Sequence, residues 1–91
     1  MRIRAYATLR DLLGASNLDR PLDAPATVGQ VLRLLAADHP DLAGKLWNAD
    51  GSLADYVTVL LNGRSVAYLQ GEATPLTDAD ALSLFPPVGG G

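Results

Sequence analysis

Residues 27–40 read TVGQVLRLLAADHP, and this stretch is the one long helix that the sequence predicts. Thr27 and Gln30 have capping-box spacing, in which each side chain accepts a hydrogen bond from the backbone N–H of the other residue. The apolar residues recur at helical intervals on one face: Val28, Val31, Leu32 and Leu35. Pro40 ends the pattern, because proline lacks the N–H that a helix interior needs. We therefore expect one amphipathic helix that covers a sheet.

The segment before this helix predicts two strands. Residues 2–8 alternate between apolar and polar side chains, which is typical of a half-buried strand. Its inward-facing side chains are Ile3, Ala5 and Ala7. Thr8 is suited to cap a short helical turn that Gly14 ends. Residues 17–23 predict a weaker strand at a sheet edge, because their proline cannot donate to a ladder.

The segment after the helix predicts a hairpin and a final strand. Residues 41–55 contain turn signals and predict a short helix plus a loop. Residues 56–69 read YVTVLLNGRSVAYL, a β-branched run followed by Asn62-Gly63, which favours a type I′ turn. A turn around Asp78–Asp80 then leads into a last strand over Ala81–Phe85.

The order strand, strand, long helix, hairpin, final strand indicates an α+β roll. It is similar to the β-grasp (ubiquitin-like) fold, a mixed sheet of four to five strands with one main helix packed on one face. In known folds of this kind, the first and last strands lie side by side and parallel. We expect one such domain over residues 1–85 and a flexible C-terminal Gly-Gly tail over residues 86–91.

The composition excludes several classes of function. The 91 residues include no cysteine, so disulfides, thiolate zinc sites and thiol nucleophiles are absent. The net charge is −3 and the six arginines and single lysine form no run, which argues against nucleic-acid binding and favours a protein partner with a basic face. No apolar stretch approaches the roughly 20 residues of a membrane span. We expect a cytoplasmic protein that does not contact membranes.

The side chains offer little chemistry of their own. The one histidine, His39, ends the main helix, where interaction with the helix dipole is a structural role. Asp78 and Asp80 look like paired carboxylates, but aspartate is favoured in turns for its local hydrogen bonds. No serine has a nucleophile context and no metal site is predicted. The sequence thus predicts no active site within the chain itself.

The stretch LFPPVGGG, residues 84–91, is the exception. Glycine has no side chain, so Gly89, Gly90 and Gly91 make a thin peptide that fits a narrow channel and presents a terminal carboxylate. Pro86 and Pro87 stiffen the exit from the last strand. A frayed terminus without function is the alternative interpretation.

A surface patch is expected beside this tail. Alternation places Tyr6 and Phe85 on the open face of the sheet, together with Leu60. Exposed contiguous apolar surface on a small protein usually marks a partner site. Burial by loops or by a second copy of the chain is the alternative.

Three stretches of this sequence resemble the MoaD/ThiS family of ubiquitin-like sulfur carriers. AYATLRDLLG (residues 5–14) is similar to the family's first strand and helix start, and YVTVLLNGRSV (residues 56–66) to its central hairpin. TPLTDADALSLFPPVGGG (residues 74–91) resembles its C-terminal signature, the most specific of the three. Ala79, where the family often has glycine, and the third glycine, Gly89, depart from the pattern.

The resemblance implies a two-step activation at Gly91. An E1-like adenylating enzyme would use ATP and magnesium to make an acyl-adenylate, and a sulfurtransferase or cysteine desulfurase would then supply sulfur to give a C-terminal thiocarboxylate. The chain itself would bind no cofactor. The resemblance also implies that Tyr6 and Phe85 match aromatic positions with which family members contact the activating enzyme and the sulfur acceptor, whereas Leu60 corresponds more loosely.

The sulfur acceptor has several candidates. The FPPV exit, residues 85–88, most resembles the small subunit of molybdopterin synthase, which predicts sulfur donation to the large subunit in molybdenum cofactor biosynthesis. A long middle segment also resembles carriers for cysteine biosynthesis or tRNA thiolation. A ubiquitin-like modifier joined to lysines through Gly91, and a binding module that uses only the sheet patch, remain open.

Overall fold

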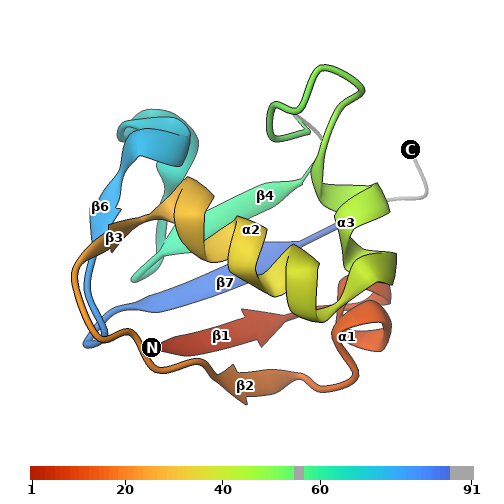
Figure 1. The fold of residues 1–91 in the computed structure, drawn as a ribbon, viewed down its shortest axis with the longest axis horizontal. Helices are drawn as coiled ribbons and strands as arrows, with labels where there is room; N and C mark the ends of the chain where they lie inside the picture. Colours follow the sequence, from red (N-terminus) through yellow and green to blue (C-terminus); the bar gives the residue numbers. More distant parts are fainter. Residues whose placement is uncertain (55–56, 87–91) are drawn as a thin grey trace.

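Five strands form one mixed sheet in the computed structural model, which describes residues 1–54 and 57–86. In sheet order the strands are β2 (Asn17–Asp19), β1 (Arg2–Ala5), β7 (Ala81–Phe85), β4 (Thr58–Leu61) and β5 (Arg64–Ser65). The first and last strands, β1 and β7, pair in parallel at the centre, as the β-grasp fold predicts. The other pairings in this sheet are antiparallel (Figure 1).

The main helix, α2 (Val28–Asp38), lies across one face of this sheet (Figure 1). Its capping box is confirmed: the Thr27 N–H donates to Gln30 Oε1 at 2.9 Å, and the Gln30 N–H donates to Thr27 Oγ1 at 3.3 Å. All the residues of its predicted apolar face are fully buried: Val28, Val31, Leu32 and Leu35. They pack against inward-facing side chains of the sheet, among them Ile3, Leu82 and Leu84. This apolar layer is the core of the domain.

Two shorter helices pack at one end of the sheet, α1 (Thr8–Leu13) and α3 (Pro40–Leu46) (Figure 1). Pro40 ends α2 as predicted and also occupies the first turn of α3, where its missing N–H leaves no intrahelical bond unmade. Gly14 ends α1 with φ 82°, as predicted. The predicted cap at Thr8 is wrong, because Thr8 is already helical and Ala7 occupies the N-cap position without a side-chain hydrogen bond.

At the opposite end of the sheet lie short elements that the sequence did not reveal, one leading into α2 and the others leading from the hairpin to β7 (Figure 1). Strands β3 (Ala26–Thr27) and β6 (Pro75–Leu76) form a separate two-stranded sheet. Two 3-10 turns, η1 (Val66–Tyr68) and η2 (Gly71–Ala73), lie between β5 and β6. Elements of two or three residues are too short to produce a recognisable periodicity.

The hairpin turn agrees with its sequence signal. Asn62 and Gly63 both have positive φ, 51° and 86°, as a type I′ turn requires. Asn62 also accepts a hydrogen bond from the Ala81 N–H at 2.9 Å, which ties this turn to the start of β7. The hairpin is therefore fixed against the central strand at its closed end.

The predicted division at residue 85 coincides with the end of β7, but residues 87–91 of the predicted tail lie outside the described residues. None of the described helices is long and apolar enough to cross a membrane. The N-terminal ammonium of Met1 lies 2.6 Å from Asp78 Oδ1 and 3.5 Å from Asp19 Oδ1, so the start of β1 is tied to the turn before β7.

Candidate functional site

Tyr6 and Phe85 stack on each other at the end of the central strands. Phe85 is the last residue of β7, and Tyr6 follows β1 directly, with its backbone N–H donating to the Leu84 carbonyl at 3.1 Å. The ring centroids are 4.3 Å apart and the ring planes are only 3° from parallel. Tyr6 remains 40% exposed. Parallel strand pairing thus builds an aromatic surface at the point where the chain leaves the sheet.

Leu60, the third residue of the predicted patch, lies on β4, the strand next to β7. The β4–β7 register places Leu60 opposite Ser83 and Thr58 opposite Phe85, so Leu60 is a diagonal neighbour of Phe85. Its side chain is half-buried. The structure therefore brings Tyr6 and Phe85 into contact and puts Leu60 on the same face. Their role in binding a partner remains a prediction.

The backbone at Ala7 turns sharply between Tyr6 and α1. Ala7 has φ 52° and ψ −128°, a conformation that L-residues rarely adopt, and hydrogen bonds from the Leu9 and Arg10 N–H groups to the Tyr6 and Ala7 carbonyls hold it. Ala7 is exposed, so the prediction that it faces the core is wrong. No glycine marks this turn, which is why the alternation of residues 2–8 suggested a longer strand.

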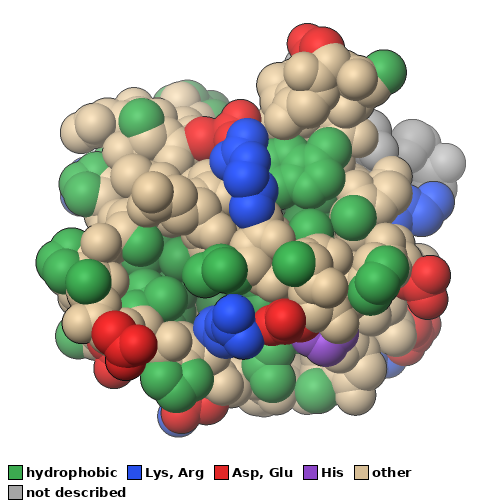
Figure 2. Space-filling view, in the orientation of Figure 1, with side chains coloured by type: hydrophobic (Ala, Val, Ile, Leu, Met, Phe, Trp, Pro, Cys, Tyr) green, Lys and Arg blue, Asp and Glu red, His purple; other side chains and the backbone are tan. Residues whose placement is uncertain are grey.

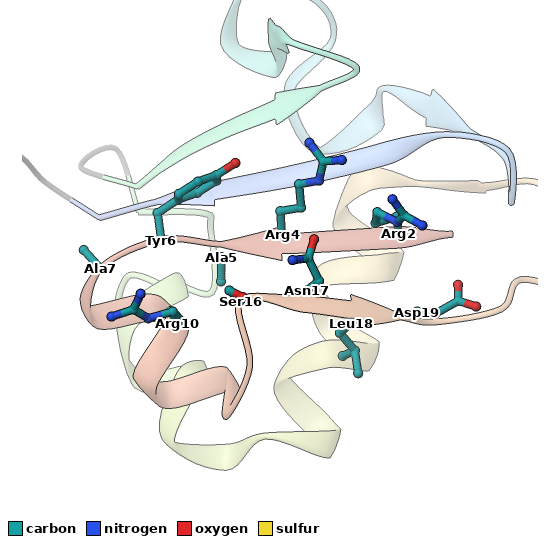
Figure 3. Close-up of a pocket in the computed structure, with 10 residues that line it drawn as sticks. All are labelled: Arg2, Arg4, Ala5, Tyr6, Ala7, Arg10, Ser16, Asn17, Leu18 and Asp19. Carbon is teal, nitrogen blue, oxygen red and sulfur yellow. The ribbon is translucent and has the colours of Figure 1, made fainter.

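A shallow hollow of about 750 Å³ adjoins the stacked pair along β1 and β2. Figure 3 shows Tyr6, Arg4 and Arg2 on the same side of β1, whereas Ala5 points to the other side. Arg10 reaches the rim from α1 (Figure 3). The alternation that places Tyr6 on the open face also places Arg2 and Arg4 there, whereas the position of Arg10 beside them appears only in the structure.

The two aspartates of the turn before β7 act as hydrogen-bond acceptors for the backbone. Asp78 Oδ1 accepts from the Leu22 N–H at 2.8 Å as well as from the N-terminal ammonium, and the hydrogen bond to that ammonium is the main reason that the pKa of Asp78 is lowered. Asp80 accepts from Asn62 Nδ2 at 2.9 Å and from the Thr77 N–H at 2.7 Å, which lowers its pKa. The bond from Thr77 to Asp80 is the local hydrogen bond that the sequence predicts, whereas Asp78 ties the turn to distant segments instead.

The predicted reactive segment is only partly described. Pro86 follows Phe85 and is half-buried. The predicted roles of Pro87, Gly89, Gly90 and Gly91 fall on residues outside the described part of the chain. Within residues 1–54 and 57–86, no cluster of three or more histidine, aspartate or glutamate side chains could hold a metal ion.

Comparison with known proteins identifies the family. The model described as "ThiS family" matches residues 3–91. The chain belongs to the ThiS family. The likeness to the MoaD/ThiS carriers and the β-grasp architecture predicted from the sequence are therefore both confirmed.

Among named relatives of this ThiS-family chain is "Small archaeal modifier protein 3" of Haloferax volcanii, 47% identical over 91 residues, with 100% of this chain and 98% of the relative covered. The crystal structure of SAMP1 from the same organism superposes with a TM-score of 0.87 at 34% identity and covers 100% of this chain and 98% of the other. "Sulfur carrier protein CysO" of Mycobacterium tuberculosis is 30% identical over 67 residues, covering 71% of this chain and 72% of its own length.

These relatives support the prediction of a ubiquitin-like sulfur carrier or modifier better than the prediction of a molybdopterin synthase subunit. They place the chain among ubiquitin-like modifiers and sulfur carriers. They give no specific support to the small subunit of molybdopterin synthase, so the alternatives to that assignment are the better-supported ones. The FPPV resemblance was too short to distinguish between acceptors.

Proposed function

We propose that this chain is a ubiquitin-like modifier, which becomes attached through the Gly91 carboxylate to amino groups of other proteins. The observation that supports this proposal most is the 47% identity to a small archaeal modifier protein over the whole chain. Tyr6 and Phe85 form a stacked aromatic pair, and Phe85 directly precedes Pro86. This pair offers an activating enzyme a surface beside the C-terminal segment.

The attachment takes two steps, each of which forms one bond and breaks another. The Gly91 carboxylate attacks the α-phosphorus of ATP and displaces pyrophosphate, which converts a poor electrophile into an acyl-adenylate. A lysine amine of the target then attacks the acyl carbon, and AMP leaves with the C–O bond electrons while the amine loses a proton. In this proposal an E1-like partner supplies the site for ATP and magnesium, and this chain supplies the Gly91 carboxylate.

Sulfur carriage is the second candidate, and the identity to a CysO sulfur carrier favours it. The same acyl-adenylate would react with the persulfide of a sulfurtransferase or cysteine desulfurase, and AMP would again leave. A thiol would then attack the enzyme's sulfur in the resulting acyl disulfide, which releases the thiocarboxylate at Gly91 and leaves a disulfide between that thiol and the enzyme. Delivery of that sulfur to cysteine biosynthesis, to tRNA thiolation or to the molybdopterin synthase large subunit is a further specialisation of this candidate.

Mass spectrometry can test both candidates. Arg64 is the last lysine or arginine of the sequence, so trypsin would leave the long peptide of residues 65–91 on any modified lysine. A Val88→Arg variant would instead leave three glycines, a remnant that can be mapped in the source cells. Modification predicts this remnant on lysines of other proteins. Sulfur carriage predicts an intact protein in which sulfur replaces one terminal oxygen.

Deletion of Gly90 and Gly91 is the matched control. The shortened chain should keep the circular dichroism spectrum and melting temperature of the full chain, because the core ends at Leu84. It should lose both adenylation by a purified activating enzyme and every conjugate. Conjugation that persists in the shortened chain would overturn the proposal, whichever product is formed.

A further inference from the structure

The open face of the sheet is locally basic, although the chain has a net charge of −3. The hollow beside the stacked pair is lined by three arginines, Arg2 and Arg4 from β1 and Arg10 from α1 (Figure 3). Among the residues described there, Asp19 is the only carboxylate. We call the surface formed by the three arginines the basic hollow.

The arginines of the basic hollow are poorly neutralised. Arg2 and Arg4 make no ion pair with any residue that the structure describes, and both are exposed. Arg10 has only a 3.9 Å contact with its neighbour Asp11, and both side chains are more than half exposed. Asp19 is 82% exposed and lies 3.5 Å from the N-terminal ammonium. Arg2 and Arg4 also line a neighbouring hollow with Asp78 and Asp80, but those two carboxylates accept hydrogen bonds from the N-terminal ammonium and from Leu22, Asn62 and Thr77. Arg2 and Arg4 thus keep their charge for a partner in spite of these acidic neighbours.

Two other arginines, Arg20 and Arg33, show the contrast, whereas Arg64 on β5 is also without an ion pair among the described residues. Arg20 donates to Asp38 at 2.6 Å, and Arg33 lies 3.1 Å from Glu72 while its guanidinium covers the Trp47 ring at 4.8 Å. These pairs join separate segments, as structural ion pairs do. The helix-covered face correspondingly shows positive and negative side chains next to each other (Figure 2). Arg2 and Arg4 serve no such purpose within the described fold.

We propose that the basic hollow binds a carboxylate-rich segment of a protein partner, whose adjoining apolar residue packs on Tyr6 and Phe85. Guanidinium groups match carboxylates with two parallel hydrogen bonds, which gives both attraction and orientation. The hollow is continuous with Tyr6, which lines it and also stacks on Phe85. An acidic stretch in the basic hollow would therefore align its partner with the strand that leads to Gly91.

The proposed partner segment is acidic, whereas the net charge of the whole chain favours a basic partner. At physiological salt, charges more than about 8 Å apart are largely screened, so the local arginines outweigh distant carboxylates for a docked segment. Three arginines without a longer basic run suit a short acidic peptide better than the extended backbone of a nucleic acid. This proposal rests on the proposed function in one respect: the partner is taken to be an enzyme that acts on the C-terminal tail.

A titration with defined probes tests the proposal without ATP or any enzyme. The probe is a synthetic peptide of alternating aspartates and glutamates that ends in phenylalanine, with the corresponding lysine peptide and oligothymidine as comparisons. Amide NMR of the full chain should show shifts at residues 2–7, 10 and 16–19, and these shifts should shrink as salt is raised. Stronger binding of oligothymidine, or shifts centred elsewhere, would overturn the proposal.

Two charge reversals separate a site from a general charge effect. Arg4→Glu should raise the dissociation constant of the acidic peptide roughly tenfold. Arg64→Glu makes the same change in net charge on β5. Arg64 is paired with the buried Leu61, so its side chain is on the face of the sheet opposite to Arg4. This variant should change the dissociation constant of the acidic peptide less than about twofold. Equal losses in the two variants would refute a localised site.

Failure of the basic hollow to bind an acidic peptide can be distinguished from failure of the proposed function. If Gly91 is never adenylated or conjugated, the peptide titration can still succeed, and the basic hollow then serves a partner of another kind. If Gly91 is conjugated normally but Arg4→Glu and Arg64→Glu behave alike, the proposed function stands and the basic hollow does not. Spectra of both variants without peptide confirm that each is folded.

Discussion

Ala7 offers a sharp test of the turn that positions Tyr6. Its φ of 52° and ψ of −128° lie in a region that glycine occupies freely and alanine does not. The Cβ of Ala7 is exposed, so its removal forfeits little packing. We therefore predict that Ala7→Gly makes the domain more stable, although glycine usually destabilises.

The size of the effect follows from two opposing terms. A non-glycine residue in such a conformation is strained by about 1–3 kcal/mol. Glycine in turn makes the unfolded chain more flexible, which costs about 0.4–1 kcal/mol. The net gain is about 1 kcal/mol, which for a domain of this size corresponds to a rise in melting temperature of about 4–8 °C.

Thermal melts followed by circular dichroism, together with urea titrations, measure this change. The urea midpoint should rise with an unchanged slope, because the same surface is exposed on unfolding. Ala79→Gly is the matched control: Ala79 is also exposed and in a turn, but its φ is not positive, so glycine should lower stability by about 0.4–1 kcal/mol. An Ala7→Gly melting temperature at or below that of the parent would refute the reasoning.

Three further predictions concern the turns and helix α2. The lowered pKa of Asp80 means that its ionised form stabilises the fold above about pH 4 and that this contribution is lost as the pH falls through the folded pKa. Asp80→Asn, which weakens the bond to Asn62, should therefore lower the urea midpoint clearly at pH 7 and much less at pH 3. Thr27→Ala removes one half of the capping box and should cost about 1 kcal/mol in the same titration. Gly29→Ala would place a Cβ 3.0 Å from Glu72 Cβ, so it should lower stability by about 1 kcal/mol, and an unchanged melting temperature would show that Glu72 moves aside freely.

Much of the fold was predictable because its signals are local. The capping box of Thr27 and Gln30, the Asn62-Gly63 turn and the alternation of β7 each lie within a few consecutive residues. The parallel pairing of β1 with β7 is different, since it joins residues about 80 positions apart, and only the likeness to known folds predicted it.

The site was less predictable, for a related reason. Alternation placed Tyr6 and Phe85 on one face, but their stacking depends on the parallel register and on the turn at Ala7, which no local motif encodes. Alternation also places Arg2 and Arg4 of the basic hollow on the open face, but it does not tell whether they form ion pairs. Their importance appears when the structure shows which arginines are paired and which are not, a distinction that composition cannot make.

The central pairing of β1 and β7 also determines how the domain responds to mechanical force. Met1 enters β1 at one end of the parallel pair, and Pro86 leaves β7 at the other end. A pull applied between these two residues slides the strands past each other, so it loads the rungs of the ladder simultaneously instead of opening them one after another. A molecular machine that drags this domain by its C-terminal side must therefore break the centre of the sheet in a single step.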